Sequence, residues 1–411
     1  MTKAIVVGAG MTGLSTAWYL QERDYDVEII DKVGVAAGAS WGNAGWLAPG
    51  KTIPLANSGL WGYGPTALFD KDAALSVPPR IDPKLWSFVA QFMARANQRS
   101  WDKTMAALTP IDKAALGAYD ELIDGGVDAV AHDVPFITAF QNESAVADVI
   151  EEIEGAARHG QNVPFDEITR EEALRYAPML SERVQTFYKL GGQRYIEPQV
   201  FCHAIAQAVT SRGGKITTGA EVTHVQSTRK PVVRLSTGES KSADVVVIAT
   251  GAWLPDLARS LGVRTSVQAG RGYSFTVRTD TEAKYPIYLP EMRVACTPAP
   301  SRGRFQLAGT MEFRGPDEPF QPRRIESIIN VTAPMFNGID WNDIEDEWVG
   351  SRPVTPDGLP LIGRTQVPNV YACGGHGMWG VVLGPISGKL LAQQIATGVT
   401  DPILDPFDPL R

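Results

Sequence analysis

Three glycines near the N-terminus have the spacing of a turn that binds a dinucleotide. Gly8, Gly10 and Gly13 follow a short apolar run and precede a helical pattern. In such a turn the first glycine permits a tight bend, the second lets the backbone approach a pyrophosphate, and the third allows close helix packing. The first helical turn, which contains Met11 and Thr12, would point its N–H groups at the phosphates. We therefore predict a dinucleotide site at this turn.

An acidic residue ends the second expected strand, DVEIID. Asp31 lies eighteen residues past Gly13, where a carboxylate can bind a ribose 2′-hydroxyl. Its charge disfavours NADP, because a 2′-phosphate would be repelled, but it leaves NAD and FAD open. Lys32 follows and belongs to the same expected site.

Two later segments favour a flavin. A buried strand is expected at 245–249, followed by Thr250 and Gly251. Residues 369–398 then suggest a strand, a glycine-rich turn and a helix, with Gly384 and Pro385 opening the helix. A helix N-terminus beside the flavin pyrimidine would stabilise the negative charge that develops on reduction. An enzyme that uses NAD alone has no need of this second cradle.

Composition excludes several other classes of protein. The chain has 411 residues, 44% of them hydrophobic, with a net charge of −8 and no run of Lys or Arg, so we expect no nucleic-acid partner. No stretch reaches the roughly 20 apolar residues of a membrane helix. Cys202, Cys296 and Cys373 have no CxxC spacing, which indicates reduced thiols in a cytoplasmic protein. Five scattered histidines give no metal pattern, so we expect no metal.

The motifs taken together resemble the D-amino acid oxidase superfamily over nearly the full length, and within it the D-amino acid dehydrogenase group. The segments that carry the resemblance, besides the glycine turn, are GASWGNAGWLAPG (38–50), residues 79–103, GRGYSFTV (270–277), LAGTMEF (307–313), SRPVTPDGLPLIGR (351–364) and GGHGMWG (374–380).

The resemblance implies an α/β fold with two interleaved domains. A Rossmann-like, glutathione-reductase-like FAD-binding domain would comprise 1–58, 193–260 and 345–411. An α+β substrate domain on a mainly antiparallel sheet would comprise 59–192 and 261–344.

Local patterns add detail to these two domains. Residues 59–80 suggest a long loop, and 83–125 suggests helix, with breaks at Pro110 and near Gly125. We expect strands at 270–277 and 305–313.

The resemblance also assigns residues to the cofactor. Ser40 and the backbone of the segment after it would pass beside the pyrophosphate and the flavin, Val222 would contact adenine, and a turn before the last helix would lie over the ring. Some related sarcosine oxidases link flavin to a Cys where this chain has Gly350 and Ser351, so we expect non-covalent FAD. The residues so assigned, beyond the first turn, Asp31 and Lys32, are Ala39, Ser40, Asn43, Ala44, Gly45, Leu47, Val222, Thr250, Gly251, Gly375, Gly377, Met378, Trp379 and Gly380.

Three side chains are candidates for the chemistry. Oxidation of an amino acid at Cα requires a fixed carboxylate and a neutral amine, so positioning is the protein's main task. Arg352 is the first candidate for binding the carboxylate; the alternative is a structural pair with Asp357 or a loop carbonyl. Tyr273 would line the pocket or simply pack in the sheet. His376 would hold a place beside the flavin, with general base catalysis as the alternative.

Three tryptophans leave the substrate open. Trp41, Trp46 and Trp379 fall in segments assigned to the flavin side, where they would either shape the pocket or pack in the core. Trp379 also departs from the dehydrogenase group, in which a smaller residue is common.

The electron acceptor distinguishes the remaining alternatives. Some sarcosine oxidases use a Lys near the flavin to promote the reaction with oxygen, and this chain has no Lys between Lys284 and Lys389. This favours a dehydrogenase that passes electrons to a quinone or carrier, with peripheral contact at the inner membrane face if the acceptor is a quinone. The alternatives are an oxidase of glycine, sarcosine or another secondary amine, and a flavin subunit of a larger dehydrogenase. Oligomeric state is left open.

Overall fold

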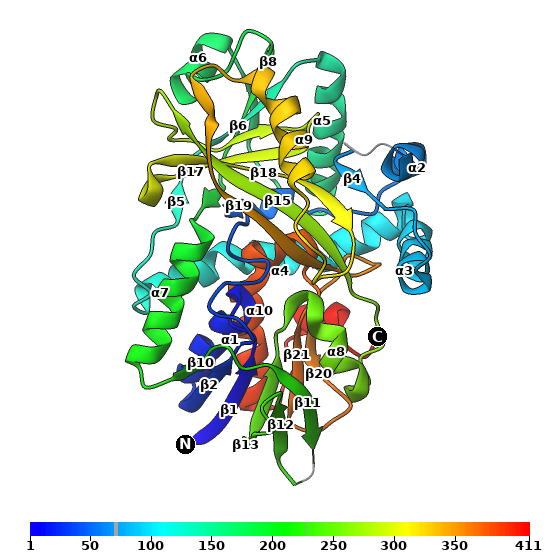
Figure 1. Cartoon of the computed structure of the whole chain (residues 1–411), viewed down its shortest axis with the longest axis vertical. Helices are drawn as coiled ribbons and strands as arrows, with labels where there is room; N and C mark the ends of the chain where they lie inside the picture. The colour runs from blue at the N-terminus through cyan, green and yellow to red at the C-terminus, as the bar shows by residue number, and fades with distance from the viewer. Residues whose placement is uncertain (70–72, 228) are drawn as a thin grey trace.

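The computed structural model describes residues 1–69, 73–227 and 229–411. Figure 1 shows two stacked parts, with both termini in the lower part. The lower part is built on a six-stranded sheet and the upper part on a larger, mainly antiparallel sheet. The chain crosses between the two parts several times, as an interleaved arrangement requires.

The lower sheet has its two N-terminal strands next to each other, and five of its six strands are parallel. Its strands in spatial order are β10 (Lys215–Thr217), β2 (Tyr25–Ile30), β1 (Thr2–Val7), β14 (Val245–Ile248), β21 (Val370–Gly374) and β20 (Leu361–Arg364), the last antiparallel to β21. The strands expected from the sequence in this sheet are confirmed.

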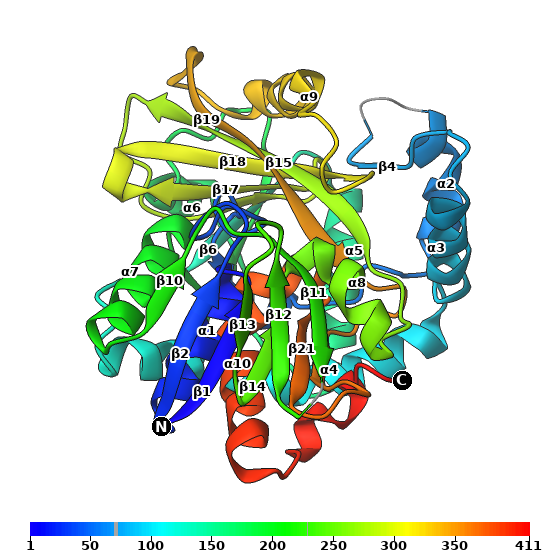
Figure 2. The same ribbon diagram turned by 60° about the horizontal axis from the view of Figure 1, so that its bottom comes forward.

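The lower sheet is buried on both faces, because its strands are continuous apolar runs whose successive side chains face opposite sides. Ala4 and Val6 of β1 face a core shared with four helices, whereas Ile5 and Val7 face the opposite core. Figure 2 shows the small antiparallel sheet β11–β12–β13 in front of these strands. The elements that cover the two faces are α1 (Met11–Gln21), α4 (Gln98–Asp124), α7 (Pro198–Ser211) and α10 (Gly380–Thr397) on one side, and β11 (Val222–Ser227), β12 (Pro231–Leu235), β13 (Ser240–Ser242) and α8 (Leu254–Ala258) on the other.

The upper sheet brings together segments that are far apart in the sequence. Its strands in spatial order are β19 (Ile339–Val354), β15 (Gln268–Thr279), β18 (Arg304–Phe313), β17 (Val294–Ala299), β16 (Ile287–Leu289), β6 (Phe136–Phe140), β8 (Thr186–Leu190) and β7 (Phe165–Ile168), with β4 (Leu75–Ser76) beside β18. The strands expected at 270–277 and 305–313 are therefore confirmed. The expected boundary at 345 falls inside β19, and the division into two domains stays a prediction.

The remaining elements surround the upper sheet. They are α2 (Leu60–Phe69), α3 (Pro83–Ala94), α5 (Glu143–Arg158), α6 (Arg170–Tyr176), α9 (Pro322–Thr332), and the short strands β3 (Trp46–Leu47), β5 (His132–Asp133) and β9 (Arg194–Tyr195). The expectation of a long loop at 59–80 was wrong for α2 and β4, because Leu60 and Leu68 of α2 and Leu75 of β4 pack in an apolar cluster with α3. Residues 70–72 of that stretch lie outside the described residues.

Two prolines lie inside helices. We expected a helix to break at Pro110 and another to begin at Pro385. α4 runs through Pro110 and ends at Asp124; Pro110 and Ala106 are exposed, so water can satisfy the carbonyl that the proline frees. α10 begins at Gly380, so Pro385 lies inside it. The Val381 carbonyl, freed by Pro385, accepts a hydrogen bond of 2.6 Å from the Tyr119 hydroxyl. A partner from another helix thus offsets the cost of this proline.

Candidate active site

The glycine turn after β1 is packed too tightly for side chains. Gly8 has φ +112°, and a Cβ there would lie 2.4 Å from the Ala249 carbonyl oxygen. A Cβ at Gly13 would lie 2.0 Å from the Gly8 carbonyl oxygen. These approaches hold the start of α1 against the turn. The N–H groups of the first helical turn have no partner within the helix, and Met11 and Thr12 of this turn line the cavity. The Met11 N–H donates to Ser40 Oγ at 3.1 Å.

Asp31 holds the turn in shape from the end of β2. Its Oδ2 accepts from the Ala9 N–H at 2.8 Å, and its Oδ1 accepts from the N–H groups of Val33 and Gly34 at 2.8 and 2.9 Å. The fixed carboxylate still has lone pairs for a hydroxyl donor, because each oxygen can accept more than one hydrogen bond. This geometry fits a bound ribose.

A cavity runs forward from the glycine turn and encloses about 1270 Å³ of atom-free space, part of it open to solvent. It extends from the ends of β1, β2 and β14 to β19 and the start of α10. The expected site residues that line it are Gly8, Gly10, Met11, Thr12, Asp31, Lys32, Ala39, Ser40, Asn43, Val222, Thr250, Gly251, Arg352, His376, Gly377, Met378 and Gly380.

Seven expected site residues are not in the cavity lining. They are Gly13, Ala44, Gly45, Leu47, Tyr273, Gly375 and Trp379. Gly45, at φ +74°, would place a Cβ 2.0 Å from the Ile196 carbonyl oxygen, and Gly375 has φ +72°. These two glycines are required by backbone packing behind the cavity, and their part in cofactor binding stays a prediction.

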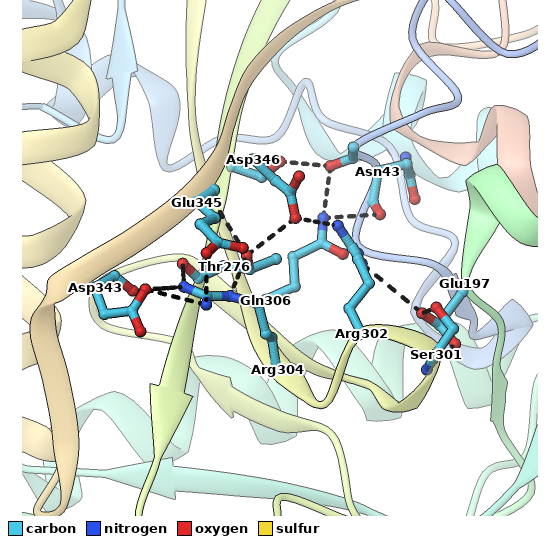
Figure 3. A network of polar contacts seen from close by, with 12 residues as sticks. Asn43, Glu197, Thr276, Ser301, Arg302, Arg304, Gln306, Asp343, Glu345 and Asp346 are labelled. Atoms are coloured by element: carbon cyan, nitrogen blue, oxygen red, sulfur yellow. Dashed lines mark hydrogen bonds and ion pairs between the residues drawn. The ribbon is translucent and has the colours of Figure 1, made fainter.

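The loop of residues 38–45, which the sequence predicts beside the flavin and which we call the flavin-side loop, is hydrogen-bonded to three adjacent strands of the upper sheet. The Gly42 carbonyl accepts from Ser274 Oγ of β15 and from Gln306 Nε2 of β18, each at 2.8 Å. The Ala44 carbonyl accepts from Thr297 Oγ1 of β17, also at 2.8 Å. Figure 3 shows Gln306 reaching the loop at Asn43. The loop that carries Asn43 to the cavity is therefore held by the upper sheet.

The charges beside this loop pair with one another. Arg302 Nη1 lies 2.5 Å from Asp346 Oδ2, and Thr276 Oγ1 donates to the same oxygen at 3.1 Å. Arg304 is buried, donates to Thr276 through Nε at 2.9 Å, and lies 3.1 Å from Asp343 Oδ1 (Figure 3). None of these four charged groups is in the cavity lining.

Arg352 brings a positive charge to the cavity. Its Nη1 donates to the Thr310 carbonyl at 2.9 Å, and it has no carboxylate within ion-pair distance among the residues that the structure describes. Asp357, the alternative partner, pairs with Arg411 at 3.0 Å. Burial lowers the pKa of Arg352 to about 10, so it is still charged at neutral pH. An anion in the cavity would complete its hydrogen bonding.

Gly272 forms the floor beneath the Arg352 guanidinium. A Cβ at Gly272 would lie 2.1 Å from Arg352 Cζ, so only glycine leaves room for this position. Opposite Gly272 the pairing of β15 with β18 slips, and Thr310 and Met311 occupy a β-bulge. Thr310 has φ +56°, which is rare for a β-branched residue. The strained bulge presents the carbonyl that Arg352 contacts.

Tyr273 points away from the cavity because neighbouring residues of a strand face opposite sides of the sheet. It is fully buried, and its hydroxyl donates to Glu312 at 3.3 Å. Burial raises the pKa of Tyr273 to about 12. Glu312 also pairs with Arg324 at 3.0 Å. The structure thus places Tyr273 in the core of the upper part, not beside Arg352.

His376 lies in the cavity wall just before α10. Its Nε2 is 2.9 Å from Ser387 Oγ, and burial lowers the pKa of His376 to about 4. The imidazole is therefore neutral at physiological pH and a weak base. This favours a positional role over general base catalysis.

The three tryptophans pack outside the cavity lining. Trp46 donates to Thr297 Oγ1 at 2.8 Å, and Trp379 donates to the Ile53 carbonyl at 3.1 Å. Trp41 packs against the core of the lower part. None of the three therefore lines the cavity.

Several lining residues were not anticipated from the sequence. They include Trp253 and Asp256 after β14, Ser351 and Pro353 beside Arg352, and Cys373 at the end of β21. Their positions along the chain could have identified them. Trp253 and Asp256 follow β14, Ser351 and Pro353 lie near the end of β19, and Cys373 lies near the end of β21. Burial raises the pKa of the Cys373 thiol to about 12, which keeps it protonated; non-covalent binding of FAD stays a prediction.

The chain is similar to known proteins over nearly its full length. The family described as FAD dependent oxidoreductase matches residues 3–394. A D-amino acid dehydrogenase of Vibrio vulnificus is 28% identical over 414 residues, covering 96% of each chain. Glycine oxidase from Geobacillus kaustophilus superposes with a TM-score of 0.75 at 21% identity, covering 100% of this chain and 99% of its own. L-proline dehydrogenase from P. horikoshii superposes with a TM-score of 0.72 at 17% identity, covering 100% of this chain and 97% of its own.

Within the described ranges, no helix combines the length and apolar character that crossing a bilayer would require.

Proposed function

This chain belongs to the family of FAD-dependent oxidoreductases, and from that premise we propose that it is a D-amino acid dehydrogenase. The reaction would oxidise the substrate at Cα to an imine, which water converts to a 2-oxo acid and ammonia. The observation that carries the proposal is the Arg352 guanidinium, which faces the cavity over Gly272 without a carboxylate partner among the described residues.

The cavity residues divide into two groups along the cofactor. Gly8, Gly10 and Asp31, with the first turn of α1, would hold the ADP half through backbone N–H groups and the fixed carboxylate. The start of α10 and the turn at His376 would lie at the flavin end, where a helix N-terminus favours negative charge. Bound FAD supplies the hydride acceptor for the substrate Cα–H.

Arg352 would bind the substrate carboxylate and so orient Cα. A guanidinium can donate two parallel hydrogen bonds to a carboxylate, which fixes direction as well as position. Among the other charged lining residues, Asp31 and Lys32 follow β2, Glu221 precedes β11 and Asp256 lies in α8, so all four belong to the lower part. Among the described lining residues, Arg352 is thus the charged side chain of the substrate end. This favours a monocarboxylate whose side chain is uncharged.

Stereochemistry and acceptor rest on other observations. The D preference is supported by the name of the Vibrio vulnificus relative. A non-oxygen acceptor is supported by the lack of lysine between residues 284 and 389. If the acceptor is a quinone, the protein would have to contact a membrane surface to reach it, and we include this peripheral contact in the proposal.

Turnover with two acceptors tests this function. The purified protein would receive D- and L-amino acids, glycine and sarcosine, with either an artificial redox dye or oxygen. We expect dye reduction and 2-oxo acid with D-amino acids that carry uncharged side chains, and little peroxide. Peroxide from glycine or sarcosine would instead identify an oxidase. Retained FAD without turnover on any substrate would identify a subunit that needs a partner.

A further inference from the structure

The loop between β18 and α9 connects the upper sheet with two residues of the cavity lining. The Pro316 carbonyl accepts from Ser351 Oγ at 3.0 Å, and the Pro319 carbonyl accepts from Arg271 Nη1 at 3.1 Å. Glu318 lies between them and accepts from Arg80 Nη1 at 2.6 Å. These anchors fix both sides of Asp317, so its position is set by the upper part of the molecule.

Asp317 contacts two residues that line the cavity. Its Oδ1 and Oδ2 accept from Trp253 Nε1 at 3.0 and 2.9 Å, and its Oδ1 lies 3.4 Å from Lys32 Nζ. Lys32 Nζ also lies 3.8 Å from the centroid of the Trp253 ring, within the range of a cation–π contact. The three side chains therefore contact one another in every pairing.

The contact has a defined place relative to the cofactor site. Lys32 follows β2 and Trp253 follows β14, and these strands flank β1, whose end forms the Gly8 turn. The two side chains thus meet in front of the turn assigned to the ADP half. Asp317 closes the contact from the other part of the chain.

We propose that Lys32, Trp253 and Asp317 form a clasp that retains FAD by closing the ADP end of the cavity. This rests on the placement of FAD described under the proposed function. Asp317 orients the indole and neutralises Lys32, and it acts as a positioning residue because it is not in the cavity lining. Release of FAD would require the clasp to open.

FAD release tests the clasp without reference to turnover. Holoenzyme variants Asp317→Asn and Trp253→Phe would be diluted, and the rise in free flavin fluorescence would give the release rate. We expect release roughly three- to tenfold faster in each, since Asp317→Asn removes the ion pair with Lys32 and Trp253→Phe removes the indole hydrogen bond. The double variant should be no faster than the stronger single one, because both changes open the same contact.

A matched control comes from an exposed ion pair far from the cavity. Glu171→Gln removes the partner of Arg175, which lies 2.6 Å away, and should leave FAD release unchanged. Melting temperatures of the apo-proteins should be equal for all variants, which separates cofactor retention from folding.

Two outcomes would overturn the clasp. One is an unchanged release rate in both Asp317→Asn and Trp253→Phe; the other is equally fast release in Glu171→Gln. Failure of the proposed function looks different, because the flavin would then resist reduction by D-amino acids whatever the release rate.

Discussion

Gly272→Ala tests the position of the candidate carboxylate-binding arginine without touching the arginine itself. The new Cβ would lie 2.1 Å from Arg352 Cζ, whereas ordinary contacts begin at 3.4 Å. The guanidinium must therefore retreat by about 1 Å or more. Gly272 does not have a positive φ, so alanine adds little backbone strain there. The effect should be transmitted through Arg352.

A misplacement of about 1 Å can cost roughly 100-fold in rate. For Gly272→Ala we accordingly expect kcat/KM for a D-amino acid to fall about 100-fold, or about 3 kcal/mol of transition-state binding. Most of the loss should lie in KM, because the carboxylate is bound before and during reaction. The assay is dye-linked kinetics, with FAD content measured on the same samples.

Gly117→Ala is the matched control. Gly117 is exposed in α4, and a Cβ there meets nothing within 4 Å. It should leave kinetics unchanged and raise stability slightly, by about 1 kcal/mol or less. If Gly272→Ala retained FAD and fold but showed the wild-type KM, Arg352 would not bind the substrate carboxylate.

Three further changes should separate the roles of the surrounding residues. Burial lowers the pKa of His376 to about 4, so between pH 6.5 and 4 the unfolded chain binds more protons than the folded chain. The free energy of unfolding should therefore fall by up to roughly 3 kcal/mol as the pH is lowered through that range. His376→Gln should remove this contribution, measured by urea unfolding at pH 7.5 and 4.5. Gly13→Ala, whose Cβ would meet the Gly8 carbonyl at 2.0 Å, should spread the turn and weaken FAD binding at least about tenfold, measured by titration of the apo-protein. Gln306→Leu removes a donor to the Gly42 carbonyl and should lower kcat several-fold while the affinity for FAD stays unchanged. Equal losses in kcat and in FAD affinity would contradict a role confined to the flavin-side loop.

Local rules predicted the nucleotide-binding part of the fold. The GxGxxG turn, Asp31 and the buried strand at 245–249 are specified by residues near in sequence, and the structure places them together. The start of α10 could not be predicted in this way, because the partner of the Val381 carbonyl is Tyr119 of another helix. The α2 error has the same origin, since its apolar residues pack on α3.

The substrate end depends on strand register, which sequence patterns left undetermined. Residues 269–277 of β15 are all buried, so no polar alternation reveals which face Gly272 or Tyr273 occupies. Gly272 meets Arg352 only because β15 pairs with β19, eighty residues later. The contact between Trp253 and Asp317 likewise joins segments from different parts of the molecule.

Anaerobic reduction of the bound flavin tests the central claim most directly. Wild-type protein and Arg352→Met would be titrated with the D and L forms of one amino acid that has an uncharged side chain. We expect the D form to bleach the wild-type flavin band, the L form to leave it unchanged, and the variant to need at least about 30-fold more substrate, since losing one partner of a buried charge pair costs about 2–5 kcal/mol. Bleaching of Arg352→Met at wild-type concentrations, or bleaching by the L form alone, would contradict the site and the stereochemistry proposed for it.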